Sequence, residues 1–167
     1  MWSVKNFIKM LDILVHLIST IKEQVMISTS HFHPMLVHFP IALIMVGFIA
    51  ELASLYFKKE ACLSFAGFYL LMAGALAALA ASLTGEFFTG QMSGGAEDVK
   101  STHELFASIT LWSVLINAAF RIYLKAAKKE KGTLKWISFV LYAISAIAVS
   151  ITGFYGGTLV YEYMMPI

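Results

Sequence analysis

The sequence predicts an all-α membrane protein whose main domain is a bundle of four transmembrane helices. Hydrophobic residues make up 59% of the 167-residue chain and charged residues only 13%, whereas soluble proteins contain about 25% charged residues. Four segments are long and apolar enough to cross a bilayer, which takes about 20 residues in a helix. We therefore expect one domain whose partner is the lipid bilayer, and we expect no nucleic-acid partner.

The N-terminal part, residues 1–30, is expected to form an amphipathic helix that lies in the membrane interface. Apolar residues recur at helical spacing from Trp2 to Val25, with Lys5, Lys9 and Asp12 among the polar residues between them. This pattern is typical of helices that lie on a membrane. A fifth span is the alternative, but the uninterrupted apolar run is short for one.

The four spans are expected within residues 31–167, and the charges of their connections predict their orientation. Basic residues gather in the first and third connections, whereas the second is glycine-rich and carries Glu86, Glu97 and Asp98 against Lys100. The positive-inside rule places the basic connections in the cytoplasm. The second connection, the C-terminus and the histidine-rich entrance to the first span then lie outside. The expected spans are 34–57, 61–84, 103–124 and 134–161, and the connections are 58–60, 86–102 and 125–131.

The spans also suggest two repeated hairpins. The sequence Ser-Leu-Thr-Gly at 82–85 resembles Ser-Ile-Thr-Gly at 150–153, and His38 and His103, at a similar separation along the chain, each open a span. The similarity is weak, and chance is the competing explanation. A real repeat would relate the hairpins by a pseudo-twofold axis along the membrane normal, as in other membrane proteins with parallel repeats.

Histidines at the outer ends of the spans are the candidate cofactor ligands. His33 precedes Pro34, which suits the first position of a helix, so we expect His33 in the cap region. Residues 33 and 38 are five apart, or about 140° around a helix, so the two histidines cannot both face the bundle interior. We expect His38 to face His103 and the two to be the axial ligands of one haem b. For His33 three roles stay open, namely binding a haem propionate, binding a metal ion or binding nothing.

Two charged residues are expected near the cytoplasmic ends of the spans. Glu51 lies in the first span and Arg121 in the third. Because an unpaired charge at this depth is costly, the sequence predicts a structural ion pair between them. The one cysteine, Cys62, allows no disulfide within the chain.

The stretches HPMLVHFPIAL at 33–43 and TGFYGGTLVY at 152–161, with the lone histidine at 103, resemble domain-of-unknown-function family 2231. The resemblance covers about residues 31–163 and implies a small four-helix protein of the bacterial inner membrane. Family members occur beside or fused to cytochrome c or iron–sulfur modules, which implies redox work for His33, His38 and His103. Many members have a further histidine after the last motif, where this chain reads Glu162-Tyr163-Met164-Met165.

Three functions follow from these observations. The first is a b-type cytochrome-like subunit that passes electrons to a c-type cytochrome or a larger redox complex, and it is not itself an enzyme. The second is copper or zinc binding on the outer side, because imidazole and thioether groups suit copper. The third is a structural or accessory subunit without a cofactor. The sequence leaves the oligomeric state open. The ligands available for copper or zinc are His31, His33, His38, Met35, Met92, Met164 and Met165.

Overall fold

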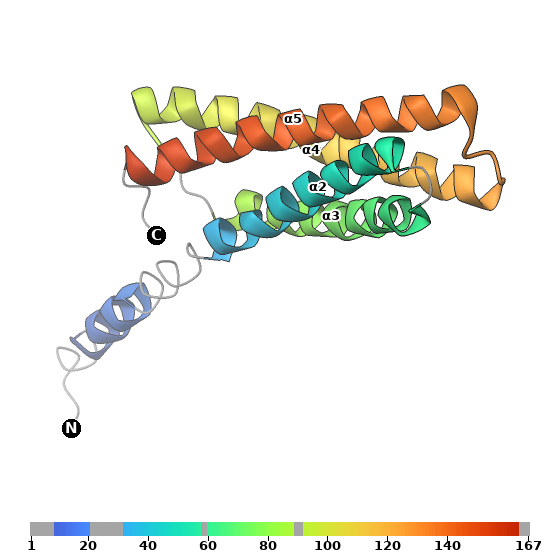
Figure 1. Ribbon diagram of the computed structural model, residues 1–167. Helices are drawn as coiled ribbons and strands as arrows, with labels where there is room; N and C mark the ends of the chain where they lie inside the picture. Colours follow the sequence, from blue (N-terminus) through green and yellow to red (C-terminus); the bar gives the residue numbers. More distant parts are fainter. Residues whose placement is uncertain (1–8, 21–31, 58–59, 89–91, 164–167) are drawn as a thin grey trace.

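The computed structural model describes residues 9–20, 32–57, 60–88 and 92–163. Within these ranges the regular secondary structure is helical (Figure 1). Four long helices follow one another along the chain, and each is long and apolar enough to cross a membrane. Their bounds are α2 Phe32–Tyr56, α3 Ala61–Phe88, α4 Gly95–Ala126 and α5 Gly132–Tyr161.

The four helices pack as two antiparallel hairpins. α2 packs along α3 and α4 packs along α5, while α2 also contacts α5 and α3 contacts α4. α2 and α4 therefore lie diagonally across the bundle (Figure 1). The start of α2, the end of α3, the start of α4 and the end of α5 share one end, which we call the histidine end. The two connections at 57–60 and 127–131 share the opposite end, which we call the basic end.

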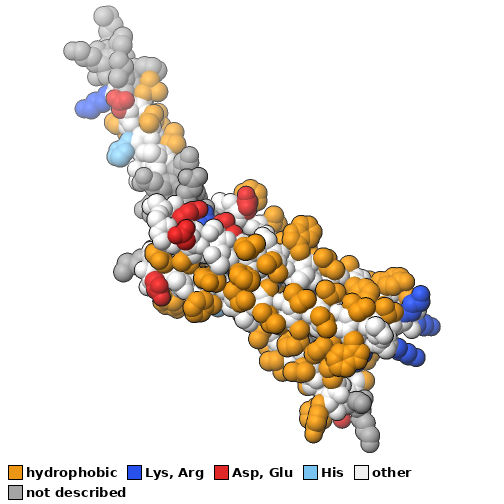
Figure 2. All heavy atoms as spheres, turned by 90° about the horizontal axis from the view of Figure 1, so that it is seen from above, with side chains coloured by type: hydrophobic (Ala, Val, Ile, Leu, Met, Phe, Trp, Pro, Cys, Tyr) orange, Lys and Arg blue, Asp and Glu red, His pale blue; other side chains and the backbone are white. Residues whose placement is uncertain are grey.

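Large side chains fill the centre of the bundle, and small ones let the helices approach. Ile44, Leu71, Val114 and Tyr142 are completely buried, and Ala75, Ala78, Ala118 and Ala146 are buried around them. Many large apolar side chains cover the outside instead, and Figure 2 shows them between charged groups at the two ends. This surface belongs in a bilayer, so the chain is a multi-pass membrane protein.

The helices differ from the expected spans mainly at the second connection. α4 begins at Gly95, whereas residues 86–102 were expected to form a loop, and α3 continues past Gly85 to Phe88. Gly94 has a φ of 65° and redirects the chain just before α4. Glu97 and Asp98 then lie in the first turn, where carboxylates favour the helix dipole. The acidic residues that were assigned to a loop therefore belong to the first turn of α4, which begins before the apolar segment.

The N-terminal prediction is met only in part. Residues 9–20 are helical, and each of their side chains is exposed. This agrees with a helix outside the bundle, but the rest of the predicted segment, residues 1–8 and 21–30, lies outside the described residues. The amphipathic character and interfacial position of this helix stay predictions.

Candidate functional site

A pair of histidine rings from diagonal helices lies at the histidine end of the bundle. His33 belongs to the first turn of α2, and His103 lies in the third turn of α4. Their ring centroids are 6.5 Å apart, with the ring planes nearly perpendicular at 89°. Both side chains are half-buried. The tertiary structure thus brings together two imidazoles from opposite halves of the membrane domain.

The hydrogen bonds of the two rings assign the same tautomer to both. His103 Nδ1 lies 2.9 Å from the carbonyl oxygen of Thr152, which only accepts, so Nδ1 carries the proton. His33 Nδ1 lies 3.1 Å from Thr84 Oγ1. That hydroxyl donates its own proton to the carbonyl of Ala81, so it accepts from His33. In the neutral imidazole, which carries one ring proton, this leaves Nε2 as the nitrogen with a lone pair for a metal.

Glycines on the neighbouring helices provide the space that the rings occupy. A Cβ added at Gly85 of α3 would lie 2.9 Å from His33 Cε1, and one added at Gly156 of α5 would lie 3.1 Å from His103 Cε1. A Cβ at Gly85 would displace the His33 ring, and one at Gly156 would lie in tight contact with the His103 ring. Each histidine thus forms a hydrogen bond with a threonine, and packs beside a glycine, of the other helix in its hairpin. These helices are α3 for His33 and α5 for His103.

The expectation that His38 faces the bundle interior is wrong. His38 is exposed, and its Nδ1 donates to the carbonyl of Pro34 in its own helix at 2.7 Å. His33 was expected in a cap, yet α2 begins one residue before it, at Phe32. Because the two histidines are about 140° apart on the helix, turning His33 inward turns His38 toward the outside.

The observed histidine pair also fits the offset between the two hairpins. His33 and His103 are 70 residues apart and Thr84 and Thr152, which hold them, are 68 apart, whereas His38 and His103 are 65 apart. The repeated Ser-x-Thr-Gly was interpreted as a sign of two repeated hairpins, and its threonines were not assigned as hydrogen-bond partners of the histidines.

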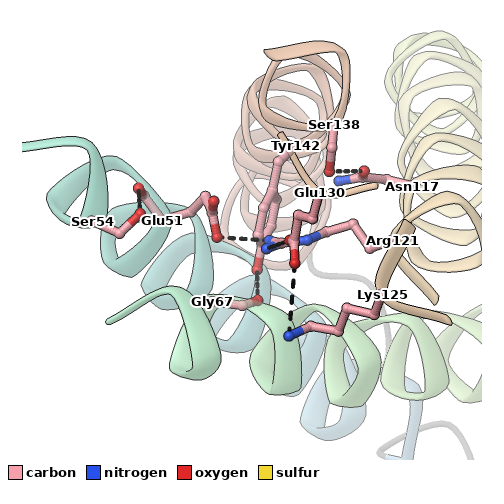
Figure 3. A network of polar contacts seen from close by, with 9 residues as sticks. All are labelled: Glu51, Ser54, Gly67, Asn117, Arg121, Lys125, Glu130, Ser138 and Tyr142. Carbon is pink, nitrogen blue, oxygen red and sulfur yellow. Dashed lines mark hydrogen bonds and ion pairs between the residues drawn. The ribbon is translucent and has the colours of Figure 1, made fainter. Parts of the chain in front are cut away.

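At the other end of the bundle the structure brings Glu51 and Arg121 together. Arg121 Nη1 donates to Glu51 Oε2 at 2.7 Å, and Arg121 Nη2 donates to Glu130 Oε1 at 2.6 Å. Lys125 Nζ lies 3.8 Å from the second Glu130 oxygen, and Figure 3 shows the group. Glu51 and Arg121 are 2% and 1% exposed, so the ion pair lies inside the protein. Their separation along the chain equals that of the two histidines of the pair.

Other metal ligands do not gather around the histidine pair in the described part of the chain. No three His, Cys, Asp or Glu side chains there come close enough to hold one metal ion. His31, Met164 and Met165, which the copper or zinc hypothesis included, lie outside the described residues. The pair of imidazoles is therefore the candidate site.

A family model described as "Predicted membrane protein (DUF2231)" matches residues 29–166. This range includes all four long helices, the histidine pair and the buried ion pair. No match was found among curated proteins or among solved structures.

Proposed function

Since the chain belongs to DUF2231, a family of predicted membrane proteins, we propose that it is a membrane electron-transfer subunit that holds one haem b between His33 and His103. One observation carries the proposal, namely two imidazole rings 6.5 Å apart whose Nδ1 atoms are both engaged. Two imidazoles on opposite sides of one metal ion, with metal–nitrogen bonds of about 2.0 Å, have centroids about 6 Å apart. The spacing therefore fits a shared metal.

The number of protein ligands favours haem over a bare zinc ion. Zinc sites take three or four protein ligands, and the described residues offer two at this place. A haem supplies the other ligands itself and takes its axial ligands from the protein. When bound, it would accept and release one electron.

The chain's own residues would orient the haem and tune it. Thr84 and the Thr152 carbonyl fix the ring orientations through Nδ1–H, and a histidine that donates in this way is a stronger ligand. Gly85 and Gly156 keep the rings in place by leaving them room. The equal spacing of the histidine pair and of Glu51 and Arg121 supports two repeated hairpins related by a pseudo-twofold axis.

Charge supports an orientation with the histidine end outside the bacterial inner membrane. Figure 2 shows lysines gathered at the basic end and most carboxylates at the histidine end. By the positive-inside rule the basic end faces the cytoplasm. The haem would then lie near the outer face, where a c-type cytochrome or a larger redox complex would exchange electrons with it. The helix at 9–20 would lie on the same face.

The visible spectrum of haem-supplied, purified protein tests the function. We expect Soret and alpha bands in the wild type and their loss in His33→Ala and in His103→Ala. His38→Ala is the matched control, because it removes a histidine from the same helix that points outward, and its bands should be unchanged. A wild-type protein without these bands contradicts the proposal. Elemental analysis then separates copper or zinc binding from a cofactor-free accessory subunit.

Removing the Thr84 hydroxyl should weaken the site. The Thr84→Val substitution removes the hydroxyl that lies 3.1 Å from His33 Nδ1, and loss of such a partner lowers metal affinity by about 10- to 100-fold. We expect haem affinity, measured by titration of the apoprotein, to fall by about 10-fold. Thr152→Val is the control. It keeps the backbone carbonyl that binds His103, so equal losses in both variants would contradict this assignment.

A further inference from the structure

Polar side chains line the middle of the contact between α4 and α5, from Thr110 to Asn117 of α4. Thr110 Oγ1 lies 3.4 Å from Thr152 Oγ1, and Ser145 Oγ donates to Ser113 Oγ at 2.9 Å. One turn further, Ser138 Oγ donates to Asn117 Oδ1 at 2.8 Å. We call these three pairs the polar seam. It leads to Arg121, which is one turn beyond Asn117 on α4.

The described residues of the first hairpin lack such a seam. At the offset that relates Glu51 to Arg121, the residues equivalent to Ser113 and Asn117 are Leu43 and Gly47. Neither of these carries a polar side chain, and Glu51 itself forms the ion pair with Arg121. A hairpin of this bundle therefore packs without polar side chains at these positions. The polar seam is a feature of the second hairpin.

Two hydrogen-bond donors in this region have no partner. Asn117 Nδ2 and Arg121 Nε are both buried, and neither has an acceptor among the described residues. Asn117 is completely buried and Arg121 is 1% exposed. Buried donors are almost always paired, so each unpaired one calls for an explanation such as a bound water or ion. Here the two donors occur together, on residues one turn apart.

We propose that Asn117 Nδ2 and Arg121 Nε bind one buried water molecule inside the bundle. Side chains four residues apart on a helix are neighbours on one face, and one water oxygen can accept a hydrogen bond of about 2.9 Å from each of two neighbouring donors. A water oxygen accepts two hydrogen bonds, which matches the two donors. Buried waters typically make about three hydrogen bonds to groups that lack partners.

The surrounding charges select water over an anion. The Arg121 guanidinium already contacts the carboxylates of Glu51 and Glu130, and Lys125 faces only the second of these. Two positive and two negative groups leave no net positive charge for a chloride or phosphate. A neutral acceptor completes the hydrogen bonds without adding charge inside the membrane.

The bound water would extend the network of Figure 3 across three helices. The network then runs from the partly exposed Glu130 through Arg121 and the water to Asn117 and Ser138. Arg121 would then have an acceptor for Nε as well as for Nη1 and Nη2, and a buried charged group needs such complete pairing.

Solid-state NMR of ¹⁵N-labelled protein in lipid bilayers tests the site. Arg121 is the only arginine in the sequence, so its Nε signal is identified without further assignment. In a water-edited spectrum we expect a cross-peak between water protons and Arg121 Nε, although the amide of the completely buried Val114 shows none. A missing Nε cross-peak in the wild type overturns the proposal. If the Asn117 amide is flipped, its oxygen accepts directly from Arg121 Nε and no water is bound there. The cross-peak is then missing too, and the proposal is overturned.

Two variants test that the water is shared. We expect Asn117→Leu to abolish the cross-peak at Arg121 Nε, because one of the two donors is gone. Ser113→Ala is the control. It removes a seam hydroxyl that already has partners in Thr110 and Ser145, and the cross-peak should remain. An unchanged cross-peak in Asn117→Leu overturns the shared site, and so does a shift of the Nε signal when bromide replaces chloride, which would identify an anion.

Discussion

Replacing Arg121 with alanine is expected to lower the free energy of unfolding by about 3–5 kcal/mol. Arg121 holds Glu51 of α2 and Glu130 of the last connection at the same time. Without it the carboxylate of Glu51, which is 2% exposed, stays buried without a partner. The desolvation cost of that charge is then uncompensated. Reversible unfolding in mixed micelles measures the effect.

Two further variants separate the ion pair from general packing. Lys125→Ala removes a more exposed cation 3.8 Å from Glu130 and should cost less than about 1 kcal/mol. The double variant Glu51→Leu with Arg121→Leu should recover most of the loss, because it removes both charges together. If the double variant is as unstable as Arg121→Ala, the charge argument is wrong.

Gly47→Ala is expected to destabilise the protein by about 3 kcal/mol, at the upper end of the usual cost of overpacking. A Cβ at this position of α2 would lie 1.9 Å from Tyr142 Oη and 2.9 Å from Leu70 Cβ. Tyr142 of α5 is completely buried, and its hydroxyl donates to the Gly67 carbonyl at 3.3 Å. The ring therefore cannot move aside without loss of other contacts. The same unfolding measurement applies.

The cause is checked with a second substitution and a matched glycine. Tyr142→Phe in the Gly47→Ala background removes the atom that clashes most but leaves Cζ at 3.1 Å, so it should restore part of the stability. Gly157→Ala in α5 meets nothing within 4 Å and should change stability by no more than about 0.5 kcal/mol. A similar loss in both glycine variants would point to backbone effects and against the clash with Tyr142.

The four membrane helices could be predicted from the sequence because their apolar segments exceed the thickness of a bilayer. The helix ends were harder. α4 starts at Gly95, well before the expected start at His103, since its first two turns carry polar and acidic residues. Hydropathy identifies only the part of a helix that lies in lipid. It does not identify polar turns that extend the helix beyond the bilayer.

The histidine site was only half predicted. His103 was identified, because a lone histidine at the start of an apolar segment is uncommon. Its partner was assigned to His38, since Pro34 suggested that the helix begins after His33. The structure begins α2 at Phe32 and turns His33 inward. α2 begins two residues earlier than expected. His33 therefore lies within the helix, and the helix fixes the direction of its side chain.

The sequence by itself determined that this chain spans a membrane four times, that histidines cluster at one end, and that Glu51 and Arg121 lie at similar depth. Composition, length and charge carry this information because each is a property of one segment at a time. Only the tertiary structure decided which histidine faces His103, which threonines hold the two rings, and which donors of Asn117 and Arg121 lack a partner. These depend on the rotation of each helix about its axis, which is set by packing against its neighbours.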